Sequence, residues 1–596
     1  MTYLGTRRLF AVLIAVQLAA CSSSAPDAVV SGATAASPAL DGSAQTPLER
    51  RRVNQTAART QVQEAPAYAP AAAPAMVAVA PPPALHAPGP VPERGRLFKP
   101  STPPSVSAVP GPSTERYAQI TDNPVKLVAE APVSTFSIDV DTGSYSNVRR
   151  MLNAGTLPPG DAVRVEELIN YFPYDYAQPS DGRPFAVHTQ MAPAPWNAER
   201  VLLRIGIKGQ DVAKQSLPPA NLVFLVDVSG SMNSQDKLPL LKSSLKLLVD
   251  EMRPQDRISL VTYASGTQVV LQPTSGADKA RIKAAIDALH AGGSTAGASG
   301  IQLAYSAAQQ SLIEGGINRI LLATDGDFNV GVADVRQLKS MVEQKRKSGI
   351  SLSTIGFGTG NYNEAMMEQV ADVGDGAYSY IDSLMEGHKV LVNEMTSTLA
   401  TIAKDVKVQI EFNPAVVKEY RLIGYENRQL RREDFNNDQV DAGDIGAGHT
   451  VTALYELTLS GAKGSIDPLR YAQAKKADNP HANANANAKA KAKAKAKANE
   501  LAHLRLRYKL PGQPSSTLID TPIARQAIAP LASTDTEFRF ATAVAIFGQL
   551  LRGGRHTGTW SYADARALAF ENQGSDRYGY RAEFVRLIDL AQAQSR

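Results

Sequence analysis

Three short loops contain the side chains that could do chemistry in this chain of 596 residues. The run Asp227-Val228-Ser229-Gly230-Ser231 offers one carboxylate and two hydroxyls, and Asp325-Gly326-Asp327 offers two further carboxylates. The loop 292–297, which contains Thr295, lies between them in the sequence. No histidine or cysteine occurs in any of these loops, and a small set of hard oxygen ligands suits Mg²⁺ or Mn²⁺, with Ca²⁺ also possible and Zn²⁺ disfavoured. The sequence therefore predicts a site for a divalent cation.

These loops follow apolar segments that alternate with amphipathic ones. The strands we predict are 222–226, 258–263, 267–271, 320–323, 351–357 and 377–381. The helices between them are 238–252, 279–289, 301–313, 335–348 and 364–373. Fully apolar strands that alternate with helices predict a doubly wound, mostly parallel sheet with helices on both faces, and 267–271 as an antiparallel edge strand. In such a sheet, ligands bind outside the carboxyl ends of the strands, where two of the three loops begin.

The three loops resemble the metal-ion-dependent adhesion site of von Willebrand factor A (VWA) domains. That pattern is Asp-x-Ser-x-Ser followed by a distant Thr and a distant Asp, and it matches Asp227, Ser229, Ser231, Thr295 and Asp325. The resemblance implies a Rossmann-like fold in which these five residues hold a divalent cation, with Mg²⁺ favoured over Mn²⁺ or Ca²⁺. It also implies a protein partner whose acidic side chain completes the metal site, since a fixed dication with an open position attracts a carboxylate.

The only cysteine, Cys21, cannot form an internal disulfide. It follows two arginines and an apolar run over 7–18, which is the pattern of an exported protein. The residues 18–21 resemble a bacterial lipobox, which implies removal of 1–20 and lipidation of Cys21. Ser22 stands where an inner-membrane retention signal would have Asp, which favours the outer membrane. We expect a lipid-anchored envelope protein; the alternative is an ordinary signal peptide with an incidental cysteine.

Composition and pattern divide the chain into six parts. We predict a lipoprotein signal peptide (1–20), a disordered Ala/Pro/Ser-rich tether (21–115), a small mixed α/β VWA-associated domain (116–216), the VWA domain (217–400), an antiparallel β domain (401–515) and a C-terminal helical region (530–596). The flanks of the VWA domain resemble those of a bacterial VWA lipoprotein family. An Ala-Asn and Ala-Lys repeat over 481–499 is foreign to that pattern, and we interpret it as a low-complexity insertion. The alternative is contact of its lysines with anionic lipid or polysaccharide.

The flanking parts contain their own predicted elements. The strands are 135–141, 185–191, 201–208, 406–412, 417–422, 451–459 and 504–508. The helices are 163–171, 384–404, 535–551, 562–570 and 584–593, and the last three are expected to form a small cap. These assignments follow the period of two residues in strands and of 3.6 residues in helices.

Two strings near the N-terminal strand could indicate an enzyme. Asp141-Thr142-Gly143-Ser144 copies the aspartic-protease string, but no second copy is present. The pair Asp139 and Asp141 resembles the aspartates of haloacid-dehalogenase phosphatases, but Gly143 departs from that pattern, and the segment is better interpreted as a turn. The 62 basic and 57 acidic residues are nearly balanced, so nucleic-acid binding is not indicated. No Ser-His-Asp triad or phosphate loop can be assigned.

Three hypotheses of function remain. The leading one is a non-enzymatic module that binds a protein partner through the metal, in adhesion or in assembly of an envelope complex. A second is a hydrolase that uses Asp139 or Asp141. A third is a scaffold protein whose metal only stabilises the fold.

Overall fold

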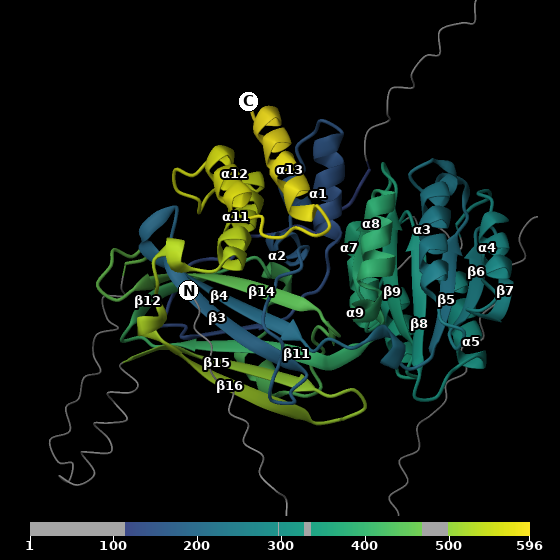
Figure 1. Cartoon of the computed structure of the whole chain (residues 1–596), viewed down its shortest axis with the longest axis horizontal. Coiled ribbons are helices and arrows are strands. Elements are labelled where there is room, and N and C mark those ends of the chain that lie inside the picture. Colours follow the sequence, from purple (N-terminus) through teal and green to yellow (C-terminus); the bar gives the residue numbers. More distant parts are fainter. Residues whose placement is uncertain (1–113, 296, 327–334, 468–498) are drawn as a thin grey trace, which may run out of the picture. The chain divides into compact units, whose positions relative to one another are not determined.

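Six strands form the sheet that carries the predicted metal loops (Figure 1). The protein is described by a computed structural model that covers residues 114–295, 297–326, 335–467 and 499–596. The strand order is β10-β9-β8-β5-β6-β7, and only β7 runs antiparallel to its neighbour. The strands are β5 Ala220–Asp227, β6 Arg257–Tyr263, β7 Thr267–Ser275, β8 Ile317–Thr324, β9 Ser351–Phe357 and β10 Tyr378–Ile381. The predicted fold class and the antiparallel edge are confirmed.

Helices cover both faces of this sheet because its strands are apolar on both sides. In β5, Leu222, Phe224 and Val226 pack toward α3 and α4, whereas Val223 and Leu225 pack toward α5, α6 and α7. Successive side chains of a strand point to opposite faces, so an uninterrupted apolar run needs two covers. The helices are α3 Leu238–Glu251, α4 Lys279–Asp287, α5 Gly297–Gln310, α6 Val335–Arg346 and α7 Glu364–Val373.

The segment 384–404, predicted as one helix, is divided into four elements. It contains α8 Leu384–His388, the π-helical turn Lys389–Asn393, α9 Met395–Leu399 and the first residues of strand β11, Thr401–Phe412. Ala403 pairs with Ile445, so the backbone at the end of the predicted helix belongs to a sheet ladder. Tertiary pairing therefore overrides the helical pattern there, and the prediction was wrong for that part.

The remaining strands form two packed sheets. The first has the order β1-β12-β14-β4-β3, with β1 Lys126–Leu127, β3 Phe185–Ala194, β4 Asn197–Gly209, β12 Val417–Ile423 and β14 Thr450–Leu459. The second has the order β13-β11-β15-β16, with β2 Val133–Ser137 also paired to β11; its other strands are β13 Ile445–Gly446, β15 Glu500–Lys509 and β16 Ser516–Ala524. Residues of β4 such as Leu203 and Ile205 meet Val408 and Ile410 of β11 in one apolar core.

The strands of this sandwich come from segments before and after the α/β domain in the sequence. Strand β4 precedes the domain and pairs along its length with β14, which follows it. Strand β2 likewise pairs with β11. In the sequence, the α/β domain (220–399) is therefore inserted between strands of one sandwich. The predicted regions 116–216 and 401–515 both contribute strands to each sheet of this sandwich.

Helices cover the outer face of the first sheet (Figure 1). The three C-terminal helices are confirmed as α11 Thr536–Leu551, α12 Tyr562–Glu571 and α13 Tyr580–Gln594. They pack with α2 Val165–Asn170 and with α1 Gly143–Asn153. The helix α1 was not predicted from the sequence. Phe172, Phe540 and Phe584 meet edge to face within 5.7 Å between ring centres, an arrangement that adds to area burial in a core.

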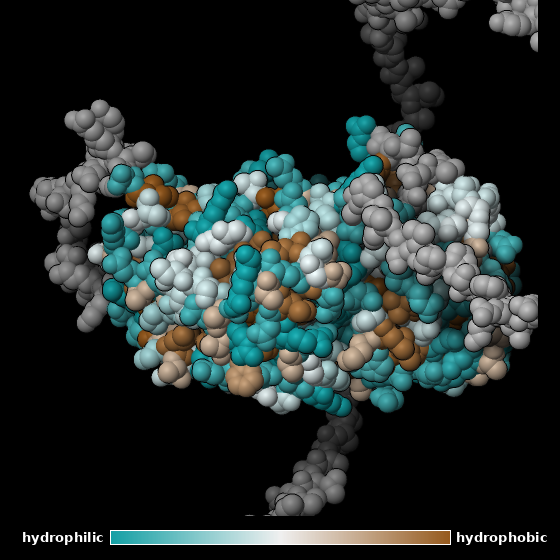
Figure 2. All heavy atoms as spheres, turned by 90° about the horizontal axis from the view of Figure 1, so that it is seen from above, coloured by the Kyte–Doolittle hydropathy of each residue, from teal (hydrophilic) through white to brown (hydrophobic). Residues whose placement is uncertain are grey.

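Hydrophobic side chains reach the surface in separate patches among hydrophilic ones, as Figure 2 shows for the face seen from above. Within the described ranges, no helix has both the length and the apolar character needed to cross a bilayer. The predicted signal peptide, Cys21, nearly all of the tether and nearly all of the repeat 481–499 lie outside the described residues.

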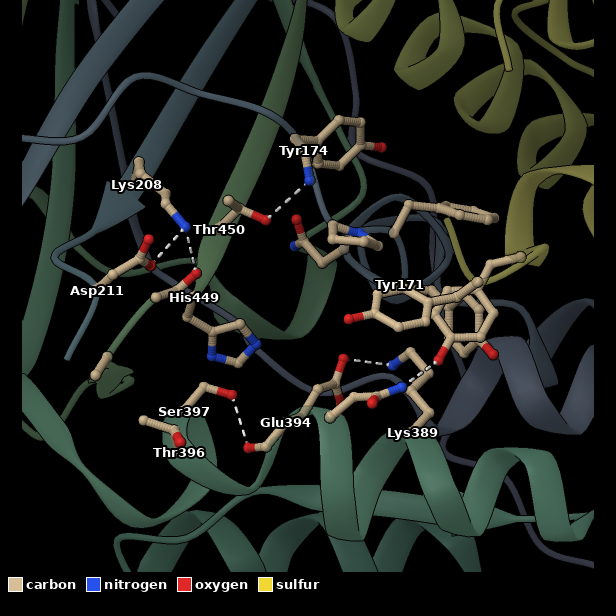
Figure 3. Close-up of a pocket in the computed structure, with 18 of the residues that line it drawn as sticks. Tyr171, Tyr174, Lys208, Asp211, Lys389, Glu394, Thr396, Ser397, His449 and Thr450 are labelled. Carbon is tan, nitrogen blue, oxygen red and sulfur yellow. Dashed lines mark hydrogen bonds and ion pairs between the residues drawn. The ribbon is translucent and has the colours of Figure 1, made fainter. Parts of the chain in front are cut away.

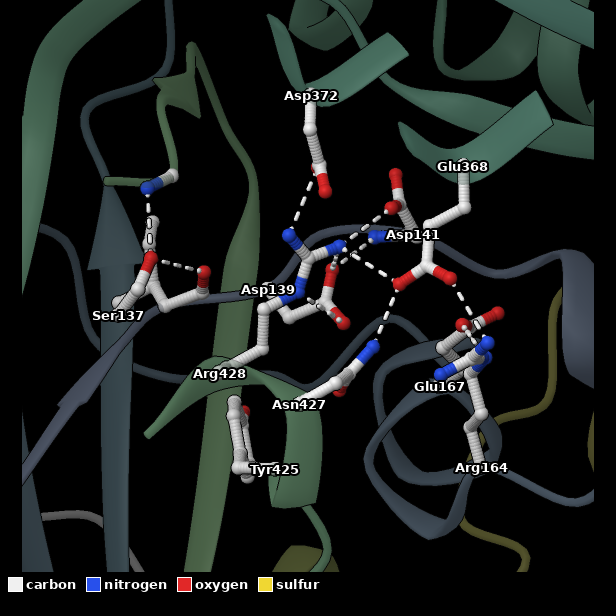
Figure 4. Close-up of polar contacts among 12 residues, drawn as sticks. Ser137, Asp139, Asp141, Arg164, Glu167, Glu368, Asp372, Tyr425, Asn427 and Arg428 are labelled. Atoms are coloured by element: carbon white, nitrogen blue, oxygen red, sulfur yellow. Dashed lines mark hydrogen bonds and ion pairs between the residues drawn. The ribbon is translucent and has the colours of Figure 1, made fainter. Parts of the chain in front are cut away.

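A largely buried arginine joins the α/β domain to the sandwich and to the segment before α1 (Figure 4). Arg428 lies within 3.3 Å of Asp139, at 2.9 Å from Asp141, at 3.3 Å from Glu368 and at 2.7 Å from Asp372. The two aspartates follow β2, the other two acids lie on α7, and the arginine follows β12. One guanidinium therefore connects three parts of the chain that are distant in sequence.

A second arginine continues the same network. Arg164 contacts Glu364 at 3.0 Å, Glu368 at 2.7 Å and Glu167 at 3.2 Å, so Glu368 bridges the two arginines. Burial raises the pKa of Glu368 to about 8 and that of Glu167 well above its usual range. The neighbouring carboxylates, which outnumber the cations here, add to both rises. The network therefore holds part of its acid groups protonated at neutral pH.

Replacing Arg428 should destabilise the protein strongly. Arg428→Met leaves the buried Asp139 and Asp141 without their cation and removes one of the two cations that Glu368 contacts, which typically costs roughly 3–5 kcal/mol of unfolding free energy. The loss should be smaller at pH 5 than at pH 8, because carboxylates without a cation take up protons more readily at low pH. Urea unfolding at both pH values measures it. Arg183→Met is the control, since both side chains of the Arg183–Asp181 pair are about half exposed; equal effects of the two variants would contradict the interpretation.

Candidate metal centre

Asp227, the last residue of β5, is a fully buried carboxylate. Its Oδ1 accepts a hydrogen bond from the Ser229 backbone N–H at 2.9 Å, and its Oδ2 accepts one from the Thr324 hydroxyl at 2.8 Å. Burial raises the pKa of Asp227 to about 6, and the nearby charge of Asp325 contributes to the rise. Among the described residues its hydrogen-bond partners are neutral groups, so the carboxylate is desolvated without a cation to offset the cost.

The loop after β5 places two hydroxyls beside this carboxylate. Ser229 is buried and Ser231 is exposed, and their Oγ atoms lie 3.0 Å apart. Two backbone hydrogen bonds fix this loop against the predicted loop 292–297: Gly230 N–H donates to the Gly293 carbonyl at 2.9 Å, and Gly292 N–H donates to the Val228 carbonyl at 2.8 Å. The first and second loops along the chain are therefore held together.

Thr295 belongs to this loop and lies just before α5. Its side chain is buried, and the hydrogen bonds of Gly292 and Gly293 anchor the backbone just before it. The structure thus brings the segment of Thr295 to the loop of Ser229 and Ser231.

Asp325 comes directly after β8, the strand next to β5. The parallel register sets Val226 opposite Ala323, so Thr324 lies beside Asp227 and Asp325 follows at the same sheet edge. Asp325 is fully buried, and its Oδ2 accepts a hydrogen bond from Lys237 Nζ at 2.9 Å. Asp327, the other acid of this loop, lies outside the described residues.

The donor set fits a small hard cation. Asp227 and Asp325 supply carboxylate oxygens, and Ser229, Ser231 and Thr295 supply hydroxyls, all from loops at the carboxyl edge of one parallel sheet. A buried carboxylate with neutral partners gains most from a cation, which supports the fit. Among described residues, no group of three or more His, Cys, Asp or Glu could hold a metal, so a site here would depend on its hydroxyls.

Asp139 and Asp141, the pair weighed for hydrolysis, are buried and occupied by other contacts. Besides Arg428, Asp141 Oδ1 accepts a hydrogen bond from the Tyr378 N–H at 2.8 Å, and Asp139 Oδ1 accepts one from the Asp141 N–H at 3.0 Å. Gly143 begins α1, and a Cβ at that position would lie 2.2 Å from the Tyr378 ring. In this structure, the Asp-Thr-Gly-Ser string packs α1 against β10.

A separate hollow of about 310 Å³ contains none of the predicted metal residues (Figure 3). In its wall, Lys389 Nζ lies 4.2 Å from the centre of the Tyr171 ring and 2.7 Å from Glu394. Burial, together with Lys389 and Lys208, lowers the pKa of His449 to about 4, so this imidazole is neutral at neutral pH. The charges of Lys389 and Glu394 offset each other, which makes the hollow a poor match for a metal ion.

Sequence reasoning missed three residues at the predicted metal centre. Thr324 bonds to Asp227, and Lys237 and Asn361 both contact Asp325, the latter at 3.4 Å. Asn361 follows β9, the strand next to β8, so the rule that ligands gather at carboxyl ends would have found it. Nothing in the sequence marked Lys237, since a lysine near a helix start is usually solvated.

Family models match three consecutive parts of the chain. A model described as von Willebrand factor matches residues 111–204, and the von Willebrand factor type A domain matches residues 221–394. A third, described as Uncharacterized protein YfbK, C-terminal, matches residues 397–594. The VWA match contains all five predicted metal residues.

Curated relatives match over very different lengths. The Uncharacterized protein YfbK of Escherichia coli (strain K12) is 54% identical over 490 residues, which cover 81% of this chain and 82% of the relative. The human inter-alpha-trypsin inhibitor heavy chain H4 is 33% identical over 163 residues, which cover 26% of this chain and 17% of that protein. The magnesium-chelatase 60 kDa subunit of Rhodobacter capsulatus is 30% identical over 169 residues, with 28% and 29% covered.

Solved structures that resemble this one include the von Willebrand factor type A protein from Catenulispora acidiphila. The match covers 68% of this chain and 90% of that one, with a TM-score of 0.37 and 16% sequence identity.

Replacing Asp227 by Asn should stabilise the protein in the absence of divalent cations at neutral pH. The folded-state pKa of Asp227 is raised, so wild type loses stability as pH rises from about 4 through about 6, and a shift of this size corresponds to about 3 kcal/mol. Urea unfolding in EDTA should therefore show Asp227→Asn more stable than wild type at pH 8, and the two nearly equal near pH 4. The exposed Asp278→Asn is the control; a gain that does not depend on pH would contradict the assignment.

Proposed function

Since the chain belongs to the family of the Escherichia coli protein YfbK and contains a VWA domain at residues 221–394, we propose that it is a metal-dependent protein-binding module of the cell envelope. VWA domains commonly mediate protein–protein interaction through a metal-ion-dependent adhesion site. The proposal extends this to one site in this chain, formed by Asp227, Ser229, Ser231, Thr295 and Asp325.

The observation that carries the proposal is the environment of Asp227. A fully buried carboxylate with neutral partners and a pKa raised to about 6 is costly in isolation, and two serine hydroxyls 3.0 Å apart follow it directly. Mg²⁺ would supply the missing positive charge, with Mn²⁺ or Ca²⁺ as alternatives. When bound, the ion would offer an electrophilic position to an acidic side chain of a partner.

The exposure of the residues suits recognition of another protein. Ser231 and the neighbouring Gly230 are exposed, whereas Asp227 and Asp325 are buried beneath them. The buried carboxylates would then hold the ion from inside, and the exposed Ser231 would lie on the side that an approaching group can reach.

The place of action rests on the sequence. The apolar run before Cys21 and the lipobox-like residues 18–21 support an N-terminal lipid anchor, and Ser22 favours the outer membrane. A lipid-anchored module that binds an acidic group on another protein suits adhesion or the assembly of an envelope complex.

A partner should be retained only with metal and an intact Asp227. The full chain is used as bait for solubilised envelope proteins in Mg²⁺, in EDTA, and as Asp227→Ala in Mg²⁺. We expect at least one protein in the first condition alone, identified by mass spectrometry. A partner that is retained equally in all three would move binding to the flanking parts, and a metal that raises the melting temperature without affecting partner retention would favour the scaffold hypothesis.

Two serines of one loop give a matched test of the metal ligands. Ser231 and Ser234 are both exposed, but only Ser231 belongs to the proposed set. Ser231→Ala should weaken Mg²⁺ binding by about tenfold or more, as removal of groups at metal sites commonly does. Ser234→Ala should bind as wild type does. Isothermal titration calorimetry measures both, and equal affinities would remove Ser231 from the site.

A further inference from the structure

A buried lysine lies against the proposed metal site. Lys237 is only 6% exposed, and its backbone leads into α3. Its Nζ donates to Asp325 Oδ2 at 2.9 Å and to Asn361 Oδ1 at 3.1 Å. Lysines are almost never fully buried unless they are paired, and the N-terminus of a helix favours anions over cations. Its position therefore depends on the carboxylate of Asp325.

The fold reserves space for the aliphatic part of this lysine. Gly358, after β9, has a φ of +77°, and a Cβ there would lie 2.2 Å from Lys237 Cε and 2.3 Å from its Cγ. The Gly358 carbonyl accepts a hydrogen bond from the Tyr380 hydroxyl at 2.6 Å, which fixes the backbone at that point. A glycine with positive φ and an anchored carbonyl thus forms the wall of a channel that the lysine fills.

The lysine changes the electrostatic balance of the site. Asp227 and Asp325 bring two negative charges. Lys237 offsets only the one at Asp325, since the described hydrogen-bond partners of Asp227 are neutral. These three side chains therefore sum to one negative charge, and a divalent cation would turn that into one positive charge. Without the lysine, the same ion would leave the three positions neutral. Charges interact strongly where water is largely excluded, so this difference should be visible in affinity.

We propose that Lys237 is the resident counter-charge of the metal site: it weakens divalent-cation binding and leaves the loaded site positively charged, so that an anionic group of the partner is needed to complete it. The inference rests on the proposed metal function and deepens it. It explains why an acidic partner is favoured over a neutral one, and why the two carboxylates differ in their partners.

Calorimetric titration of the full chain with Mg²⁺, and separately with Mn²⁺, tests the proposal. Lys237→Met removes the charge and keeps most of the side-chain volume, so the dissociation constant should fall by about tenfold or more. Lys237→Arg keeps the charge and should stay within about threefold of wild type. Melting temperatures in EDTA report stability separately. A Lys237→Met protein that is less stable but binds metal as wild type does, or more weakly, would overturn the proposal and leave the lysine a structural ion pair.

A second variant leaves the lysine in place. Asn361→Asp puts a carboxylate where the amide oxygen now lies 3.1 Å from Lys237 Nζ. It should also tighten metal binding by about tenfold or more, because it offsets the ammonium charge. Unchanged affinity in this variant would count against the proposal even if Lys237→Met does not fold.

Asp227→Ala tests the metal site separately from the role of Lys237. If wild type binds Mg²⁺ and Asp227→Ala does not, the metal site stands, and the lysine variants decide the present inference alone. If wild type and Asp227→Ala bind metal equally, the proposed function itself fails and the inference fails with it.

Discussion

The parallel pairing of β5 with β8 is the constraint on which the site depends. It places the end of one fully apolar strand beside the end of another, so that Asp227 meets Thr324 and Asp325 comes next along the same edge. The apolar strands and the helices on both faces exclude water from these carboxylates. Burial makes the oxygens costly to leave without a cation, and the same burial would make a bound cation effective.

Charge is handled differently at the two buried acid clusters. In the network of Arg428 and Arg164, internal cations and protons offset the carboxylates, and the result is a joint between α7, the segment after β2 and the sandwich. At the sheet edge, within the described part of the chain, Asp325 has an internal cation, whereas the hydrogen-bond partners of Asp227 are neutral. The first arrangement is complete without any ligand. The second has a deficit of positive charge beside the exposed hydroxyl of Ser231, which is why it is the better candidate for binding.

Local pattern predicted most of the α/β domain and the grouping of its loops. Strands such as β9 and helices such as α7 agree with the expected bounds, because their apolar periodicity and their packing favour the same structure. Where they conflict, packing decides: the helical pattern over 384–404 gives way to β11 because that backbone pairs with β13 and β15. The helix α1 begins Gly-Ser-Tyr-Ser, a weak helical sequence, and is stabilised by burial against β10. The pairing of β4 with β14 and the burial of Lys237 depend on residues far away in sequence, which local pattern does not report.

The position of the α/β domain between two strands of one sheet has a consequence for synthesis. Lys208 of β4 pairs with Thr450 of β14, so β4 leaves the ribosome long before its partner exists. At about 5–20 residues per second, the wait is roughly 10 to 50 s. The strands of the α/β domain are complete by Ile381 and the last helix that packs on it by Leu399, so the whole insert is made before β14. An insert that folds before the first sheet pairs would bring the ends of β4 and β14 together in place of a long loop. Folding of the insert would thus favour the pairing of β4 with β14.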